Sequence, residues 1–151
     1  MMTSTEKTST PVAGWRVVCD QIFRWVALLG LILSLLQVAF AALGFWGAEE
    51  KPGDQDWGMA AFEPHAITGM ILYGLAIVLL ILGLLSRAGW QVWVIPIVLF
   101  LLLYFVQGLL VGLGFGVSRW FGFLHAVDGV LIIAGFGWLF GDRMRHPLRQ
   151  A

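Results

Sequence analysis

Two histidines, His65 and His125, are the side chains of this sequence best placed to bind a metal ion or to carry a proton. Each begins the pattern His-Ala-x-x-Gly, which ends at Gly69 in one copy and at Gly129 in the other. Residues four positions apart lie on one face of a helix, so each glycine removes side-chain bulk beside its histidine. A flat ligand or a neighbouring helix backbone can then approach each imidazole closely.

The same two histidines belong to an internal repeat. Each copy begins with a glutamine, Gln37 or Gln107, and seven residues later comes the glycine of a Leu-Gly-Phe triplet. The histidine of the same copy, His65 or His125, follows the triplet. The glutamines are 70 residues apart and the histidines 60, so the second copy differs by a loop shortened by ten. A repeat indicates a unit stacked against itself. We therefore expect the two histidines to occupy equivalent places in one bundle.

Other small and polar residues of the repeat are expected to hold helices together. We expect Gln37 and Gln107 to hold the first and third helices together by hydrogen bonds. Gly108 and Gly112 form a Gly-x-x-x-Gly pattern, which predicts a close-packing face in the third helix.

Composition places the chain in a bilayer. Of its 151 residues, 60% are hydrophobic and only 12% are charged. A transmembrane helix needs about 20 apolar residues, and four stretches reach that length: 26–46, 65–85, 94–115 and 120–140. Pro96 falls in the first turn of the third stretch, where proline is tolerated. The sequence predicts an all-α, polytopic membrane protein with four transmembrane helices in a bundle of two parallel two-helix repeats.

The arginines give the orientation, because short cytoplasmic loops are rich in Lys and Arg. Arginines lie near the amino terminus, in the turn after the second span and in the tail, whereas the first loop is acidic. We expect both termini to be cytoplasmic and both repeated histidines to lie near the outer surface. The expected divisions are a disordered cytoplasmic head (1–14), a four-helix transmembrane domain (15–141) and a basic cytoplasmic tail (142–151), which contains a solvated His146.

Charge and cysteine content limit the possible partners. The formal net charge is zero, which gives no case for nucleic acid. Cys19 is the only cysteine, so the chain has neither an intramolecular disulfide nor a covalent haem attachment pattern. The expected partner is the lipid bilayer itself, and an oligomer remains open.

Haem is the ligand that the histidine pair favours. Spans two and four run in the same direction, so the two imidazoles lie at similar depth and can ligate the iron of one haem b from both sides. Arg119 is the only arginine on the outer side and either meets the haem propionates or serves as an interfacial anchor. Thr68 and Asp128 lie three residues after the histidines and are candidates to fix the imidazole tautomers. Asp128 alternatively meets headgroup water or bonds a neighbouring helix.

Two other interpretations of the histidines stay open. They can serve only as structural hydrogen-bonding groups between helices. They can also join Glu63 and Asp128 in a proton site or a non-haem metal site, for which imidazole with carboxylate suits zinc or iron.

The sequence resembles a family of small four-span bacterial membrane proteins of unknown function. The resemblance covers nearly all of the chain from about residue 20 to 140. The residues that carry it are Leu43-Gly44-Phe45, Phe62-Glu63-Pro64-His65, Gln107 and Leu124-His125-Ala126-Val127-Asp128-Gly129. Relatives often have proline and asparagine where this chain has Ala126 and Asp128. The resemblance implies the fold, the topology and a bacterial cytoplasmic membrane, but no activity.

The chain is also distantly similar to one four-helix half of haem A synthase. That resemblance implies haem b ligation by His65 and His125, which match histidines at the outer ends of the second and fourth helices. The enzyme needs two such halves and a glutamate three residues before its first histidine, where this chain has Phe62. We therefore expect a haem-binding relative and not a stand-alone haem A synthase.

Two functions from different classes follow. The first is one-electron transfer by a bis-histidine haem b, to or from a quinone or a redox partner subunit. The second is a cofactor-free accessory or scaffold protein, supported by the scarcity of residues outside the membrane. A transporter is a third possibility, for which four short spans with one intramembrane acid make a weak case.

Overall fold

The computed structural model describes residues 12–149, and this part of the chain folds into helices without a strand. The elements are, in chain order, α1 (Gly14–Glu49), α2 (Gln55–Ala61), α3 (Glu63–Ser86), α4 (Gln91–Leu101), the π-helix η1 (Leu102–Val106), α5 (Gln107–Gly116) and α6 (Arg119–Arg145). Because α4, η1 and α5 are continuous, they form one long helix, Gln91–Gly116.

Four of these helices are long and apolar enough to cross a membrane. They contain 36, 24, 26 and 27 residues, and about 20 suffice for a hydrocarbon core roughly 30 Å thick. Large apolar side chains are exposed along all four, which is the surface expected of helices surrounded by lipid. The chain is a multi-pass membrane protein, and the predicted all-α bundle of four transmembrane helices is confirmed.

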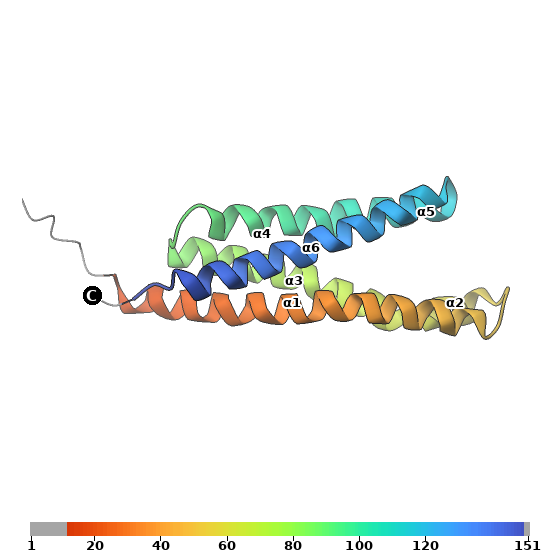
Figure 1. Ribbon diagram of the computed structural model, residues 1–151, viewed down its shortest axis with the longest axis horizontal. Helices are drawn as coiled ribbons and strands as arrows, with labels where there is room; N and C mark the ends of the chain where they lie inside the picture. Colours follow the sequence, from red (N-terminus) through yellow and green to blue (C-terminus); the bar gives the residue numbers. More distant parts are fainter. Residues whose placement is uncertain (1–11, 150–151) are drawn as a thin grey trace, which may run out of the picture.

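The four long helices form a bundle in which each packs against two neighbours (Figure 1). Helix α1 contacts α3 and α6, and the helix Gln91–Gly116 contacts the same two. The histidine-bearing helices α3 and α6 therefore lie diagonally across the bundle. We call the end with α2 the distal end, and the end where α1 begins and α6 ends the terminal end (Figure 1).

The apolar core occupies the half of the bundle away from α2. Its fully buried side chains include Phe23, Leu72, Leu79, Leu99, Phe136 and Leu139. Small residues let the helices approach there, because a methyl group added at Gly30 would overlap the ring of Phe136. Close packing is therefore concentrated on one side of the histidines, and the distal ends of the helices are left to diverge.

Pro96 lies deeper in its helix than the sequence predicted. The helix begins at Gln91, so Pro96 is inside α4 and buried, not in the first turn. Proline has no N–H to bond the carbonyl four residues earlier, and that carbonyl belongs to Val92. The Val92 oxygen packs against Gly83 of α3, where any Cβ would overlap it. Pro96 and Gly83 thus join α3 to α4.

The third span contains a π-helical turn that the sequence analysis missed. Residues Leu102–Val106 form η1, directly before Gln107. Such turns insert an extra residue and occur often at functional sites. Here the turn rotates everything that follows, including Gln107, by about 100° relative to a regular helix.

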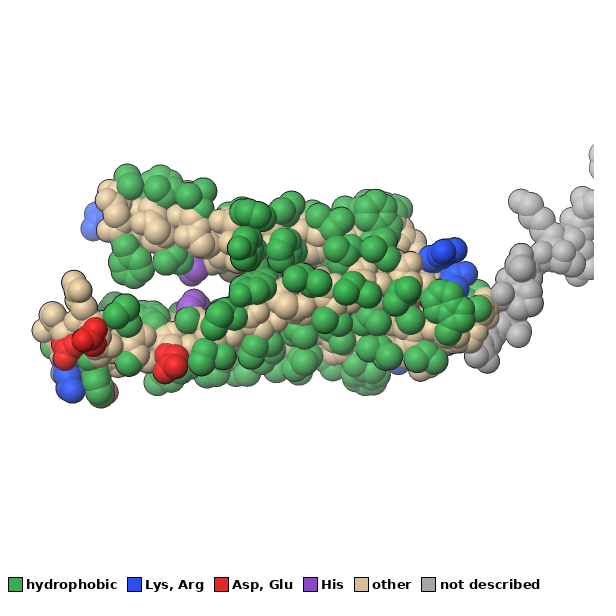
Figure 2. All heavy atoms as spheres, turned by 180° about the vertical axis from the view of Figure 1, so that it is seen from behind, with side chains coloured by type: hydrophobic (Ala, Val, Ile, Leu, Met, Phe, Trp, Pro, Cys, Tyr) green, Lys and Arg blue, Asp and Glu red, His purple; other side chains and the backbone are tan. Residues whose placement is uncertain are grey.

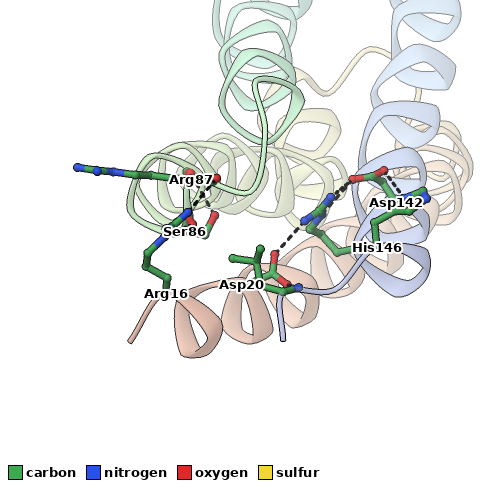
Figure 3. Close-up of polar contacts among 9 residues, drawn as sticks. Arg16, Asp20, Ser86, Arg87, Asp142 and His146 are labelled. Atoms are coloured by element: carbon green, nitrogen blue, oxygen red, sulfur yellow. Dashed lines mark hydrogen bonds and ion pairs between the residues drawn. The ribbon is translucent and has the colours of Figure 1, made fainter. Parts of the chain in front are cut away.

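A buried ion pair closes the terminal end of the bundle (Figure 3). Arg143 of α6 lies 3.2 Å from Asp20 of α1 and 2.6 Å from Asp142. The second oxygen of Asp20 accepts a hydrogen bond from the main-chain N–H of Leu148 at 2.9 Å. Asp20 therefore ties both α6 and the following segment to α1, and the sequence analysis had not singled it out.

The expected divisions of the chain shift slightly. Residues 1–11 of the predicted head lie outside the described residues, and α1 already begins at Gly14. In the predicted tail, α6 continues to Arg145. His146 follows with a side chain that is 70% exposed, as expected, and it contacts Asp142 at 3.1 Å.

Candidate functional site

The bundle brings His65 and His125 together across its diagonal. His65 lies in the first turn of α3 and His125 in the second turn of α6. Their ring centroids are 6.2 Å apart and the ring planes are inclined by 54°. Both histidines line one cavity, and Figure 2 shows histidine side chains (purple) on the two sides of a hollow at the distal end. The sequence prediction that the two imidazoles face each other agrees with this arrangement.

The hollow is a cavity of about 540 Å³ lined by all four spans. That volume is within the range of roughly 300–1,000 Å³ typical of ligand sites. Apolar side chains form most of the wall and a few polar groups converge on it. The polar residues that line it are Ser34, Gln37, His65, Tyr73, Tyr104, Gln107 and His125. An apolar site with a few fixed polar groups is typical of a cofactor pocket.

Gln37 orients His65 through the main chain. The carbonyl oxygen of Gln37 in α1 accepts a hydrogen bond from Nδ1 of His65 at 3.2 Å. Because a carbonyl can only accept, the ring proton sits on Nδ1, and the lone pair is on Nε2. This contact fixes the tautomer and the orientation that a metal-binding imidazole needs.

Gln107 contacts the main chain of His125. Its side-chain amide donates to the main-chain carbonyl of His125 at 3.1 Å. The Gln107 main chain is also a neighbour of the His125 ring, but Nδ1 of that ring is buried without a hydrogen-bond partner. Each histidine is therefore supported by a glutamine of its adjacent helix.

The predicted pairing of the first and third helices through the glutamines is wrong. In the described residues, α1 makes no close contact with the helix Gln91–Gly116. The two helices are diagonal neighbours across the cavity, so Gln37 reaches α3 and Gln107 reaches α6. The glutamines join the helices within each pair instead.

The two repeated glycines leave space for those glutamines. A Cβ at Gly69 would lie 3.2 Å from Nε2 of Gln37, and one at Gly129 would lie 3.9 Å from Nε2 of Gln107. Both glycines also line the cavity. By contrast, a Cβ at Gly108 or Gly112 would meet nothing within 4 Å. The predicted close-packing face at those two residues is therefore wrong.

Thr68 and Asp128 are both buried one turn after the histidines. The Thr68 hydroxyl donates to the carbonyl of Pro64 in its own helix at 2.8 Å. Thr68 was predicted to orient the His65 ring, but the hydrogen bond to that ring comes from Gln37. Oδ2 of Asp128 is buried without a hydrogen-bond partner, and Asp128 does not line the cavity.

Arg119 and Glu63 lie outside the site. Arg119 is the exposed first residue of α6, six residues before His125, and Glu63 is the exposed first residue of α3. Across the described chain, no three His, Cys, Asp or Glu side chains converge to hold a metal ion. The alternative zinc or iron site of Glu63, His65, His125 and Asp128 is therefore not assembled.

The sequence analysis missed the two tyrosines of the site. Tyr73 of α3 and Tyr104 of η1 line the cavity and contact each other, with ring centroids 5.7 Å apart at 87°. They are the only tyrosines in the sequence, and both fall inside predicted apolar spans. That unusual position was the signal that could have identified them.

Comparisons of this chain with family models, with curated proteins and with solved structures find no match.

Proposed function

We propose that this protein binds one haem b between His65 and His125 and serves one-electron transfer in the membrane. The distance between the two rings carries the proposal. Imidazoles on opposite sides of a metal, with metal–nitrogen bonds of about 2.0 Å, have ring centroids about 6.3 Å apart. The ring centroids of His65 and His125 are 6.2 Å apart, a separation that matches the one expected for two imidazoles on one metal.

The cavity supports a cofactor of this kind. It combines a volume of about 540 Å³ with apolar walls and with an opening between the helix pairs. The cavity wall next to the histidines contains four small residues: Gly69, Gly129, Ala66 and Ala126. Because these residues are small, they do not cover the imidazole rings. A haem with imidazole on both axial positions exchanges single electrons and has no open position for oxygen.

The residues of the chain have separate parts in this proposal. His65 and His125 would hold the iron, and the Gln37 carbonyl keeps Nδ1 of His65 protonated, which leaves Nε2 of that ring free to bind a metal. Gln107 fixes the main chain at His125. Arg119, the exposed first residue of α6, lies outside the cavity lining, and we keep its two expected roles: contact with the propionates or an interfacial anchor.

The absorption spectrum of the purified protein tests the proposal. Protein produced with ample haem supply is expected to show a sharp Soret band and, after dithionite reduction, the α and β bands of low-spin b-type haem. His65→Ala and His125→Ala should each lose this spectrum. His146→Ala, which changes the exposed third histidine at the terminal end, should keep it. An unchanged spectrum in His65→Ala contradicts the ligand assignment.

A cofactor-free accessory or scaffold protein is the second candidate, and one observation favours it. The contacts of Gln37 with His65 and of Gln107 with His125 join α1 to α3 and α5 to α6, which suffices as a structural role. In that case His65→Gln and His125→Gln preserve folding and function, because glutamine still forms hydrogen bonds. In the haem protein both substitutions abolish the low-spin spectrum.

We propose further that the protein lies in a bacterial cytoplasmic membrane with both termini in the cytoplasm. The terminal end carries most arginines, and short cytoplasmic loops are rich in such residues. Single cysteines in a Cys19→Ser background test this orientation in intact cells. A membrane-impermeant maleimide should label Glu50→Cys in the distal loop and leave His146→Cys unlabelled. The reverse pattern contradicts the orientation.

A further inference from the structure

Tyr73 and Tyr104 form a second feature of the histidine cavity. Tyr73 lies eight residues after His65 in α3, which is about 12 Å further along the helix axis and away from the distal end. Tyr104 lies in the π-helical turn, three residues before Gln107. The rings meet edge to face and both line the cavity. The cavity thus has histidines at one level and tyrosines at another.

An aromatic surface connects this part of the cavity with the lipid-facing side. The Tyr104 ring stacks on Phe100 at 5.5 Å with an interplanar angle of 7° and meets the edge of Phe105 at 4.9 Å. Tyr104 is 53% exposed and Phe105 is 56% exposed. A flat ring arriving from the bilayer would therefore meet aromatic side chains from the protein surface to the cavity wall.

The two phenol hydroxyls are available to a ligand. Neither forms a side-chain hydrogen bond with any described residue, unlike the hydroxyls of Ser34 and Thr68 nearby. Neither hydroxyl is among the buried atoms without a partner, so both can donate to a ligand that carries acceptor oxygens.

We propose that the cavity also binds a lipid-soluble quinone, with its ring against Tyr73 and Tyr104 and its isoprenoid tail in the bilayer. The inference deepens the proposed function and rests on it, because a quinone is the membrane-dissolved partner class for a one-electron haem. A quinone ring is flat, carries two carbonyl acceptors and has an apolar tail, which matches the aromatic surface, the free phenol donors and the lipid-side opening.

Direct binding to the full-length protein in detergent tests this site. The probe is ubiquinone with one isoprene unit, titrated by calorimetry into wild type and into the double variant Tyr73→Phe, Tyr104→Phe, which keeps both rings. We expect saturable binding of one quinone to wild type and a dissociation constant about tenfold higher in the double variant, the effect of losing a hydrogen bond. Phe115→Leu, which changes an exposed ring remote from the cavity, should bind as wild type does.

A photoreactive azidoquinone provides a second measurement that does not depend on a variant. Its label should map to peptides that contain Tyr73 or Tyr104, and exclusive labelling elsewhere overturns the site. The quinone site is also overturned if wild type shows no saturable binding, or if wild type and the double variant have equal dissociation constants. Added phosphatidylcholine that displaces the quinone equally from wild type and from the double variant would identify a site for acyl chains. That result would also overturn the quinone site.

Haem spectra of the same samples separate this proposal from the haem site. A coloured protein without saturable quinone binding overturns the quinone site and leaves the haem assignment intact. A colourless protein that binds the quinone in a tyrosine-dependent manner supports the quinone site and contradicts the haem.

Discussion

The imidazoles of His65 and His125 face each other at 6.2 Å from helices that do not pack against each other. Each ring is held by its own helix pair, α1 with α3 and α5 with α6. The apolar core that joins the two helix pairs lies away from α2. The histidines therefore face each other where the two pairs diverge towards the distal end (Figure 2). The separation of the rings therefore depends on the core that joins the pairs.

Gly69→Leu should prevent haem binding. Any side chain at this position must displace the Gln37 amide, which a Cβ would approach to 3.2 Å, and a leucine must also fill part of the cavity. Gly74→Leu in the same helix is the matched control, because a Cβ there meets nothing within 4 Å. Haem content per protein, measured by absorbance, should fall in the first variant and stay at the wild-type value in the second. Equal haem content in both variants contradicts the location of the site.

Gln107→Leu should destabilise the distal half of α6. The substitution removes the amide that donates to the His125 carbonyl at 3.1 Å. Hydrogen bonds between membrane helices contribute about 0.6 kcal/mol on average and up to about 1.7 kcal/mol. Unfolding in mixed micelles of increasing sodium dodecyl sulfate measures this loss. Gln21→Leu, at an exposed position of α1, is the control, and a loss of equal size there argues against a specific contact at Gln107.

Arg143→Leu should cost about 3 kcal/mol of unfolding free energy. It leaves the buried Asp20 carboxylate without its cation, and breaking a buried ion pair in this way costs about 3–5 kcal/mol. Adding Asp20→Asn should recover most of the loss, since the more deeply buried carboxylate is then neutral, while Asp142, which also loses Arg143, keeps its contact with His146. Arg145→Leu removes an exposed arginine that bonds only the Gly141 carbonyl among the described residues, so it should cost less than about 1 kcal/mol. The same micelle titration measures all variants, and an Arg143→Leu protein as stable as wild type would refute the role of the pair.

Gly83→Ala should destabilise the protein more than Gly74→Ala does. A methyl group at Gly83 overlaps the main-chain carbonyl of Val92, and that carbonyl cannot rotate away as a side chain can. Overpacking of this kind costs about 1–3 kcal/mol, whereas Gly74 has open space. Equal stability of the two variants would show that α3 and α4 can separate without cost.

The sequence predicts where the helices lie and that His65 and His125 come close together. It does not predict which side chains form hydrogen bonds with them. Hydrophobic length determines where a helix crosses the bilayer, and the repeat places His65 and His125 at similar depth. Side-chain partners depend on helix rotation, which sequence periodicity does not specify. The π-helical turn before Gln107 and the interior position of Pro96 change that rotation, and neither is visible in hydropathy. The order of the helices around the bundle is not visible either: Gln37 contacts α3 because α1 and the helix Gln91–Gly116 are diagonal neighbours.

Asp20 shows a second reason for incomplete prediction. In the sequence it lies between arginines near the amino terminus, as an ordinary solvated charge would. Its burial follows from the packing of α1 against α6, 123 residues later in the chain. No local pattern contains that information.

A haem titration of the purified protein tests the central claim most directly. Haem is added in small steps to haem-depleted wild type and to the double variant His65→Ala, His125→Ala, and the low-spin Soret band is recorded. We predict that the wild-type band grows linearly and stops at one haem per chain, while the double variant shows only the broad spectrum of free haem. A wild-type titration without saturation, or the same low-spin band in the double variant, would contradict the bis-histidine haem site.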